Sequence, residues 1–234
     1  MKYCFIVSSA IHTKNKVMAA NVDTDLNLYD DEVRYNQTIE TLKNIREYVD
    51  CDIYLLDSSY KKLSSNYRSE LEKYCNVVEY SSPIADKVYE SIKTIWKLQN
   101  SVETLAMSWF LKEHAQELKE YSRIFKISGR YLMTKEFSLY KHTCSHVKDK
   151  FLFLTENKDG LSTRLYSFDG SLVDYHIDVT KKILEFMQEV GHKSGNYACL
   201  EAGYRKFVEP QYLITTKVMG VCGYNANMGG WCNE

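Results

Sequence analysis

The sequence predicts an α/β protein with a mainly parallel central sheet flanked by helices. Residues 3–8 (YCFIVS), 32–49 and 51–56 (CDIYLL) read as a strand, a helix and a second strand. A strand–helix–strand unit of this length joins parallel strands. Strand-like and helix-like segments keep alternating through the N-terminal half, and the elements then become mixed, which is typical of this class. With 44% hydrophobic residues in 234, the chain can bury a core of that size.

The first helix is predicted by its start and by its apolar spacing. Asp30, Asp31 and Glu32 place acids at a helix N-terminus, where the macrodipole favours them. Apolar side chains then recur at helical spacing at positions 33, 39, 42, 45 and 49. Further elements expected in this half are helices at residues 65–74, about 86–99 and 101–121, and a strand at 76–80.

The second half is expected to begin with an alternating, β-prone strand at residues 123–127. Further strands are predicted at 150–155, 162–168 and 212–216, and helices at 171–190 and 197–207. Gly191 should end the first of these helices through a C-cap. The tail from residue 220 to residue 234 is rich in Gly and Asn, and no element is predicted there.

Charge and cysteine usage exclude several classes of protein. The formal net charge of −1 argues against nucleic acid or an acidic membrane surface as the main partner. The apolar start is too short to cross a membrane and lacks a signal-peptide cleavage pattern. Seven scattered cysteines form no Cys-x-x-Cys pair, which favours reduced thiols. We therefore expect a cytoplasmic protein with no integral membrane segment.

Most common catalytic and metal motifs are absent from the sequence. It contains no GxSxG, Walker loop or GxGxxG, so hydrolase, kinase and dinucleotide-binding functions lack support. Only His142 and His146 share an i, i+4 spacing, and they have no acidic or Cys cluster nearby. Such a pair by itself does not predict a metal site.

The strand at residues 123–127 ends in a pattern that suggests a binding site. Ser128 and Gly129 break the strand, and Arg130 and Tyr131 follow at once. Ligands of open α/β sheets bind at the carboxyl ends of strands. The other interpretation is a buried strand, a glycine turn and a surface arginine, since Gly marks turns in any protein.

Three stretches of the chain resemble a known family. They are RYNQT at residues 34–38 leading to IYLLDSS at 53–59, RIFKISGRYLMT at 123–134, and YACLEAGYRKF at 197–207 with VMGVCGYNANMG at 218–229. On these motifs the chain resembles glycosyltransferase-like proteins of the GT-A type, in particular a group found in bacteria, phages and large viruses. The resemblance spans most of the chain.

The resemblance implies a GT-A-like nucleotide-sugar-binding fold and a role in glycan biosynthesis. We expect one domain over residues 1–234, with a donor-binding half at 1–120 and an acceptor-binding, catalytic half at 121–234. The implied activity moves a sugar from a nucleotide-sugar donor to a glycan or other hydroxyl acceptor. The alternative is a non-catalytic GT-A-like subunit that binds a sugar nucleotide or a glycan.

The family usually holds a divalent metal on the diphosphate through Asp-x-Asp at a mid-chain strand end. Ser128, Gly129 and Arg130 stand at that place here, without an acid. The two Asp-x-Asp triplets, at residues 23–25 and 50–52, are not at the expected strand end. The cofactor is therefore left open between two alternatives. One alternative is a divalent metal, Mn²⁺ or Mg²⁺. The other is a metal-independent site, in which the Arg130 guanidinium would pair with the diphosphate, unless Arg130 forms a structural salt bridge.

The resemblance also implies a set of site residues. Donor binding is assigned to Ser8, Ser9, Arg34, Asp57, Lys97, Ser128, Gly129, Arg130 and Tyr131. Asp57 would accept a hydrogen bond from the base or the ribose, unless it is a turn residue bonded to its own backbone. Lys97 and Glu103 lie on the helices that are expected before the strand at residues 123–127. They either face the cleft or form a solvated ion pair.

Glu201 is the predicted catalytic base. An inverting sugar transfer needs a carboxylate to take the proton of the acceptor hydroxyl. Apolar and small residues surround Glu201, and partial burial would raise its pKa. The other interpretation is an exposed helix glutamate. Asp169 and Asp174, which follow the strand at 162–168, are the next candidates for the base.

Overall fold

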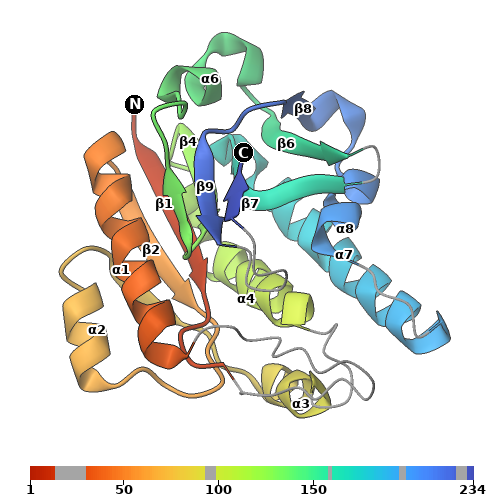
Figure 1. Ribbon diagram of the computed structural model, residues 1–234. Helices are drawn as coiled ribbons and strands as arrows, with labels where there is room; N and C mark the ends of the chain where they lie inside the picture. Colours follow the sequence, from red (N-terminus) through yellow and green to blue (C-terminus); the bar gives the residue numbers. More distant parts are fainter. Residues whose placement is uncertain (14–29, 93–98, 158–159, 195–198, 225–230) are drawn as a thin grey trace.

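The computed structural model describes residues 1–13, 30–92, 99–157, 160–194, 199–224 and 231–234 (Figure 1). Its main sheet has seven strands in the order β3-β2-β1-β4-β7-β6-β8. Their bounds are Tyr3–Ser9 (β1), Asp52–Asp57 (β2), Asn76–Glu79 (β3), Arg123–Ser128 (β4), Phe151–Asn157 (β6), Gly160–Phe168 (β7) and Leu213–Thr216 (β8). Neighbouring strands are parallel except where β7 meets β4 and β6. The predicted α/β class with a mainly parallel sheet is confirmed.

Helices cover both faces of this sheet (Figure 1). The helices are Asp31–Tyr48 (α1), Ser65–Leu71 (α2), Pro83–Ile92 (α3), Gln99–Glu113 (α4), Ala115–Leu118 (α5), Leu139–Thr143 (α6), Val173–Ser194 (α7) and Leu200–Phe207 (α8), with short 3-10 turns at Ser145–Val147, Gly170–Leu172 and Pro210–Tyr212. Successive strand residues point to opposite faces. Phe5 of β1 thus packs with α1 and α2, and Ile6 packs with α4, α7 and α8. The first helix begins as expected, because the Asp30 side chain accepts a hydrogen bond from Val33 N.

A second, smaller sheet lies beside α1. It joins β5 (Tyr131–Met133), β9 (Val221–Tyr224) and β10 (Trp231–Asn233) in the antiparallel order β10-β9-β5. The Asn44 side chain of α1 fixes β5, since its amide donates to Met133 O (3.3 Å) and its carbonyl accepts from Met133 N (2.6 Å). Gly220, just before β9, has a φ of 78°. This left-handed conformation is easy for glycine and strained for other residues.

Several predicted boundaries are wrong, each for a physical reason. Gly191 does not end its helix, because α7 continues to Ser194, and glycine weakens a helix without obliging it to stop. The single helix expected at residues 101–121 is divided into α4 and α5 at His114, whose backbone is not helical. The tail, for which no element was predicted, forms β9 and β10. These strands could not be predicted from local residues, because the partner of β9 is β5, which is remote in sequence. Among the helices of the described part, none is both long and apolar enough to cross a membrane.

Candidate functional site

The strand order creates a topological switch point between β1 and β4. The chain goes from β1 to β2 and β3 on one side, and then returns to place β4 on the other side of β1. Ligands of open α/β sheets bind outside the carboxyl ends of strands at such a point. Ser8 and Ser128 are register partners there, and Gly129 N donates to Ser8 O at 2.8 Å. A Cβ on Gly129 would lie 3.2 Å from Ser9 Cβ, so the glycine allows this close approach.

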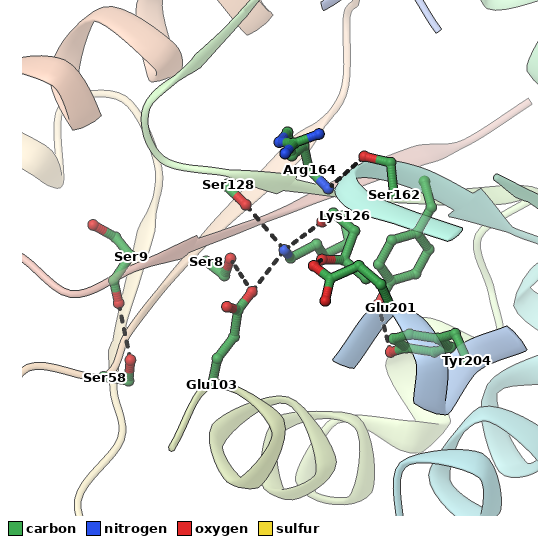
Figure 2. A network of polar contacts seen from close by, with 12 residues as sticks. Ser8, Ser9, Ser58, Glu103, Lys126, Ser128, Ser162, Arg164, Glu201 and Tyr204 are labelled. Carbon is green, nitrogen blue, oxygen red and sulfur yellow. Dashed lines mark hydrogen bonds and ion pairs between the residues drawn. The ribbon is translucent and has the colours of Figure 1, made fainter. Parts of the chain in front are cut away.

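A buried lysine lies at the centre of this edge. The Lys126 side chain points to the α4 side of the sheet and is 2% exposed. Its ammonium contacts Glu103 Oε1 at 2.7 Å, Thr163 O at 2.7 Å and Ser128 Oγ at 3.1 Å (Figure 2). A lysine ammonium has three N–H donors, and a buried charge is costly unless it is paired. Lys126 therefore links α4, β4 and the start of β7 through one charge.

Glu103 of α4 is the charged partner of this lysine, and it also contacts the end of β1. Its Oε1 accepts a second hydrogen bond, from Ser8 Oγ at 2.9 Å. Its side chain keeps 32% exposure, whereas Lys126 keeps almost none. Burial acts to raise the pKa of the Glu103 carboxyl, but Lys126, Ser8 and the charge of Arg130 outweigh it and leave the pKa below its ordinary value. Glu103 is therefore an ionised carboxylate at neutral pH.

Glu201 reaches the same cluster from α8. It lies in the first turn of that helix, and its Oε1 accepts from Thr163 Oγ1 at 2.9 Å. Thr163 contacts Lys126 through its carbonyl and Glu201 through its hydroxyl. Figure 2 shows both carboxylates directed toward the Lys126 ammonium. The structure thus places Glu201 beside the strand ends, which the sequence alone did not establish.

Buried contacts hold α8 in position. Tyr204, one turn after Glu201, shares hydrogen bonds with Tyr166 OH (2.9 Å) and His176 Nε2 (2.8 Å). A Cβ on Gly203 would lie 2.9 Å from the Ile183 side chain, so α8 packs closely on α7. Burial lowers the pKa of His176 to about 3, and this imidazole is neutral at ordinary pH. The base candidate therefore stands on a rigidly packed helix.

Asp169 and Asp174 are not alternatives to Glu201, and that prediction is wrong. The strand before them, β7, runs antiparallel to β4, and its end at Phe168 pairs with Ile124 at the start of β4. Asp169 therefore follows β7 at the opposite edge of the sheet, where its side chain accepts from Ser171 N. Asp174 pairs with Lys119 at 2.7 Å. The antiparallel direction instead brings the start of β7, with Thr163, to the site.

Ser9 and Arg34 fix the loop after β1 against α1. Ser9 Oγ shares a hydrogen bond with Thr38 Oγ1 at 3.1 Å, and Thr38 also contacts Gly129 O at 3.3 Å. Arg34 is 6% exposed, and its guanidinium donates to Ala10 O at 2.9 Å. Both predicted residues thus border the switch point and shape its backbone.

Asp57 is more deeply buried than a ligand contact would require. It is 1% exposed, and its two oxygens accept from Ile11 N at 3.1 Å and Ser59 N at 3.0 Å. The bond with Ser59 is of the kind that the turn interpretation predicts, whereas the bond with Ile11 joins the end of β2 to the segment after β1. Burial nevertheless raises the pKa of this carboxyl. Asp57 also lines a pocket of about 480 Å³ at the ends of β2 and β3, beside Tyr60, Lys62 and Tyr80.

The remaining predicted residues differ in their positions. Arg130 is half-buried directly after β4, and its charge helps to lower the pKa of Glu103. Tyr131 is 3% exposed in β5, with its ring 5.9 Å from the Arg164 guanidinium carbon. Lys97 lies outside the described residues. Glu103 was expected to form a solvated ion pair if it did not face the cleft, but its salt-bridge partner is the buried Lys126.

The residues at the end of β4 do not fit a divalent metal. Ser128, Gly129 and Arg130 supply no carboxylate, and Glu103 already binds the Lys126 ammonium. Within the described ranges no group of three or more His, Cys, Asp or Glu side chains could hold a metal ion. The cation nearest this strand end, Lys126, already has protein acceptors for its three N–H donors.

The other metal candidates lie elsewhere. Asp52 begins β2 at the opposite edge of the sheet, where it accepts from Tyr121 OH at 2.7 Å. The Asp-x-Asp triplet at residues 23–25 lies outside the described residues. His142 is buried, bonds Ser167 Oγ at 2.7 Å and has its pKa lowered to about 3 by burial. It is a core histidine rather than a ligand.

Lys126 and Thr163 were missed by the sequence reasoning. A lysine inside an alternating strand fits an ordinary β pattern, in which polar side chains face solvent. The available signal was its place in RIFKIS, a strand expected to be covered by helices on both faces. In such a strand every side chain is buried, so a charged residue needs a partner.

Comparisons with known proteins agree with the fold. No family model and no curated protein matches the chain. A glycosyltransferase from Streptococcus pneumoniae TIGR4, GlyE in its apo form, has a TM-score of 0.50 at 8% identity, with 92% of this chain and 45% of that chain covered. A glycosyltransferase involved in glycosylation of the PBCV-1 major capsid has a TM-score of 0.46 at 7% identity, covering 92% and 81%. The apo form of mouse xyloside xylosyltransferase 1 has a TM-score of 0.45 at 9% identity, with 92% of this chain and 84% of that chain covered.

The likeness at a TM-score of 0.50 concerns the fold and not the activity, because so few residues are identical. The chain has a GT-A-like fold, with a mostly parallel sheet of seven strands between helices.

Proposed function

We propose that the protein is a glycosyltransferase that moves a sugar from a nucleotide-sugar donor to a glycan or other hydroxyl acceptor. The observation that carries this proposal is the convergence of Glu201, the Glu103–Lys126 pair and the Ser128–Gly129–Arg130 strand end at one topological switch point. A carboxylate and an arginine suit a reaction in which a proton leaves the acceptor and negative charge develops on a diphosphate, and the Glu103–Lys126 pair fixes the elements that carry them.

The donor diphosphate binds at the carboxyl ends of β1 and β4 in this proposal. Arg130 pairs with its oxygens through the guanidinium fork, and the Ser8 and Ser128 hydroxyls border the same space. Ser9, Arg34, Gly129 and Tyr131 hold the surrounding backbone, while Asp57 belongs to the nucleoside side. Lys97 is kept as a donor-binding residue. Residues 1–120 form the donor-binding half, and residues 121–234 form the acceptor-binding, catalytic half.

Glu201 acts as the base. In a direct displacement the acceptor oxygen attacks the anomeric carbon, and the bond from that carbon to the diphosphate oxygen breaks. The proton of the acceptor hydroxyl passes to the Glu201 carboxylate, and the electron pair leaves with the nucleoside diphosphate. The Thr163 hydroxyl, which donates to Glu201 Oε1, orients the carboxylate for this transfer.

Donor binding needs no divalent metal in this proposal. Its support is the chemistry of the strand end, where the chain offers the Arg130 guanidinium but no free pair of acids. The same feature favours a second candidate function, a non-catalytic GT-A-like subunit that binds a sugar nucleotide or a glycan. The two differ in turnover, because a binding subunit would hold the donor without consuming it.

A thermal-shift screen of nucleoside diphosphates and nucleotide sugars, with and without Mn²⁺, tests donor binding. A ligand present at one hundred times its Kd adds about 2.7 kcal/mol to the free energy of unfolding, which is readily visible in Tm. Slow hydrolysis or transfer of the stabilising nucleotide sugar would support the enzyme. Stabilisation without consumption would support the binding subunit, and no shift with any nucleotide would contradict both.

Arg130→Lys tests the proposed diphosphate contact. Lysine keeps the charge and loses the bidentate fork, so we expect nucleoside diphosphate affinity to fall by about tenfold or more. The matched control is Arg205→Lys, an exposed arginine on α8 that should leave affinity unchanged. EDTA should change wild-type affinity little. Strong EDTA sensitivity would show a metal held by other acids and would contradict the role of Arg130.

A further inference from the structure

In the proposed function the transferred sugar lies between the diphosphate at Arg130 and the base Glu201, where two acidic side chains meet. Glu103 and Glu201 reach it from α4 and α8, on either side of the Lys126 ammonium (Figure 2). The printed contacts of Lys126 occupy its three donors, and the ammonium is 2% exposed, so its charge is directed at the protein and not at a ligand. The Glu103 side chain, in contrast, keeps 32% exposure, and Glu201 is partly exposed.

Glu103 has a defined orientation and one open side. Lys126 at 2.7 Å and Ser8 at 2.9 Å both contact Oε1, and the side chain keeps 32% exposure. A carboxylate has about four lone-pair sites, so this one retains capacity to accept further hydrogen bonds. Its pKa is lowered by Lys126, Ser8 and Arg130 against the effect of burial, so it cannot donate at neutral pH.

We infer that Glu103 determines sugar specificity: its carboxylate accepts a hydrogen bond from a hydroxyl of the transferred sugar, and the site takes a neutral sugar and rejects one that carries a carboxylate. This inference rests on the proposed function. An acceptor-only group rewards a hydroxyl at this place and repels a second anion. Glu201 adds a second negative charge close by. Lys126 compensates the charge of Glu103 only from the buried side, because its donors face the protein.

Matched pairs of nucleotide sugars test this inference on the wild-type chain without any substitution. We would measure the affinities of UDP-glucose and UDP-glucuronate, and of GDP-mannose and GDP-mannuronate, against UDP and GDP as references. For the base that the protein accepts, we expect the nucleotide of the neutral sugar to bind at least about tenfold more tightly than the nucleotide of the corresponding uronate. Equal affinity within that pair would overturn the inference while leaving donor binding intact. If the thermal-shift screen shows that another base is accepted, the neutral and acidic sugars of that base are compared in the same way. Failure of every nucleoside diphosphate and nucleotide sugar in that screen would overturn the proposed function and the inference with it.

Substitutions assign the discrimination to one residue. Glu103→Gln replaces an anion by an amide that can donate to a carboxylate, so the preference for the neutral sugar should fall toward unity, while UDP or GDP affinity stays within about twofold. The double variant Glu103→Gln/Lys126→Met removes both charges and should behave alike, which covers the case in which an unpaired lysine impairs folding. Glu113→Gln is the control, an exposed glutamate ten positions along α4. Full preference in both Glu103 variants, or its loss only in Glu201→Gln, would overturn the role of Glu103.

Discussion

Lys126 shows how one buried side chain organises a site. An ammonium enclosed in the fold needs an acceptor for each N–H, and here these acceptors come from α4, β4 and β7. The pair with Glu103 orders the elements that meet at the switch point. Buried ion pairs add little net stability compared with well-packed apolar residues, but the loss of one partner is costly.

Lys126→Met should therefore destabilise the protein at neutral pH, by about 2–4 kcal/mol, because it leaves the Glu103 carboxylate without its cation. Unfolding in urea measures the change. Lys119→Met is the matched control, since it removes the more exposed pair with Asp174 and should cost no more than about 1 kcal/mol. Similar losses in both variants would contradict the importance assigned to Lys126.

The pH dependence of stability provides a second readout for this pair. The folded-state pKa of Glu103 lies below its ordinary value of 4.5, so its contribution is present above pH 4.5 and is lost as the pH falls through the lowered pKa. In Lys126→Met the carboxyl stays partly buried without a partner, and its pKa should rise. The difference in stability between wild type and variant should then shrink on acidification, and a constant difference would contradict this coupling.

Glu201→Gln should separate binding from turnover. Glutamine keeps the shape of the side chain but cannot accept the proton, so we expect nucleotide-sugar affinity like that of the wild type and transfer at least about a hundredfold slower. Glu185→Gln, an exposed glutamate on α7, is the control. Wild-type transfer by Glu201→Gln would exclude this residue as the base.

At the scale of elements, the small sheet supports the loop that carries Arg130. Tyr131 of β5 pairs with Gly223 of β9, and a Cβ on Gly223 would lie 2.4 Å from Arg130 O and 2.8 Å from Tyr131 Cδ1. These contacts are too short for any side chain, so β9 presses against the backbone of the proposed diphosphate site.

Gly223→Ala should therefore push β9 away from β5 and shift Arg130. We expect a loss of stability of about 1–3 kcal/mol and weaker nucleoside diphosphate binding. Denaturant unfolding and a binding titration measure the two effects. Cys222→Ala, in the same strand, removes atoms instead of adding them and should leave binding unchanged. Unaltered affinity in Gly223→Ala would show that β9 does not position Arg130.

At the scale of the whole molecule, the six co-directional strands of the main sheet end at one edge. Donor binding there should slow amide hydrogen exchange in peptides that cover Ser8–Ser9 and Ser128–Arg130. Peptides at the opposite edge, around Asp52 and Asp169, should exchange as before. Protection confined to the opposite edge would place the ligand elsewhere and contradict the site.

The α/β class and most elements of the main sheet could be predicted from the amino-acid sequence. Apolar runs such as residues 3–8 and 51–56, and the helix between them, are local signals, so strand and helix positions follow from neighbouring residues. The strand end at Ser128–Arg130 was visible for the same reason, because a glycine break directly after a β-prone run is local. The resemblance to GT-A-type proteins added Glu201 as a candidate, but not its distance from any other residue.

Which side chains meet could not be predicted in this way, because it depends on how distant segments pack in three dimensions. Two of the three partners of Lys126, Glu103 and Thr163, are far from it in sequence. No local sequence pattern predicts a contact between α4, β4 and β7. The direction of β7 was equally hidden, because an apolar strand has the same sequence signature whether it runs parallel or antiparallel to its neighbour. That direction brought Thr163 and Glu201 together and sent Asp169 to the far edge, since reversing a strand exchanges the residues at its two ends.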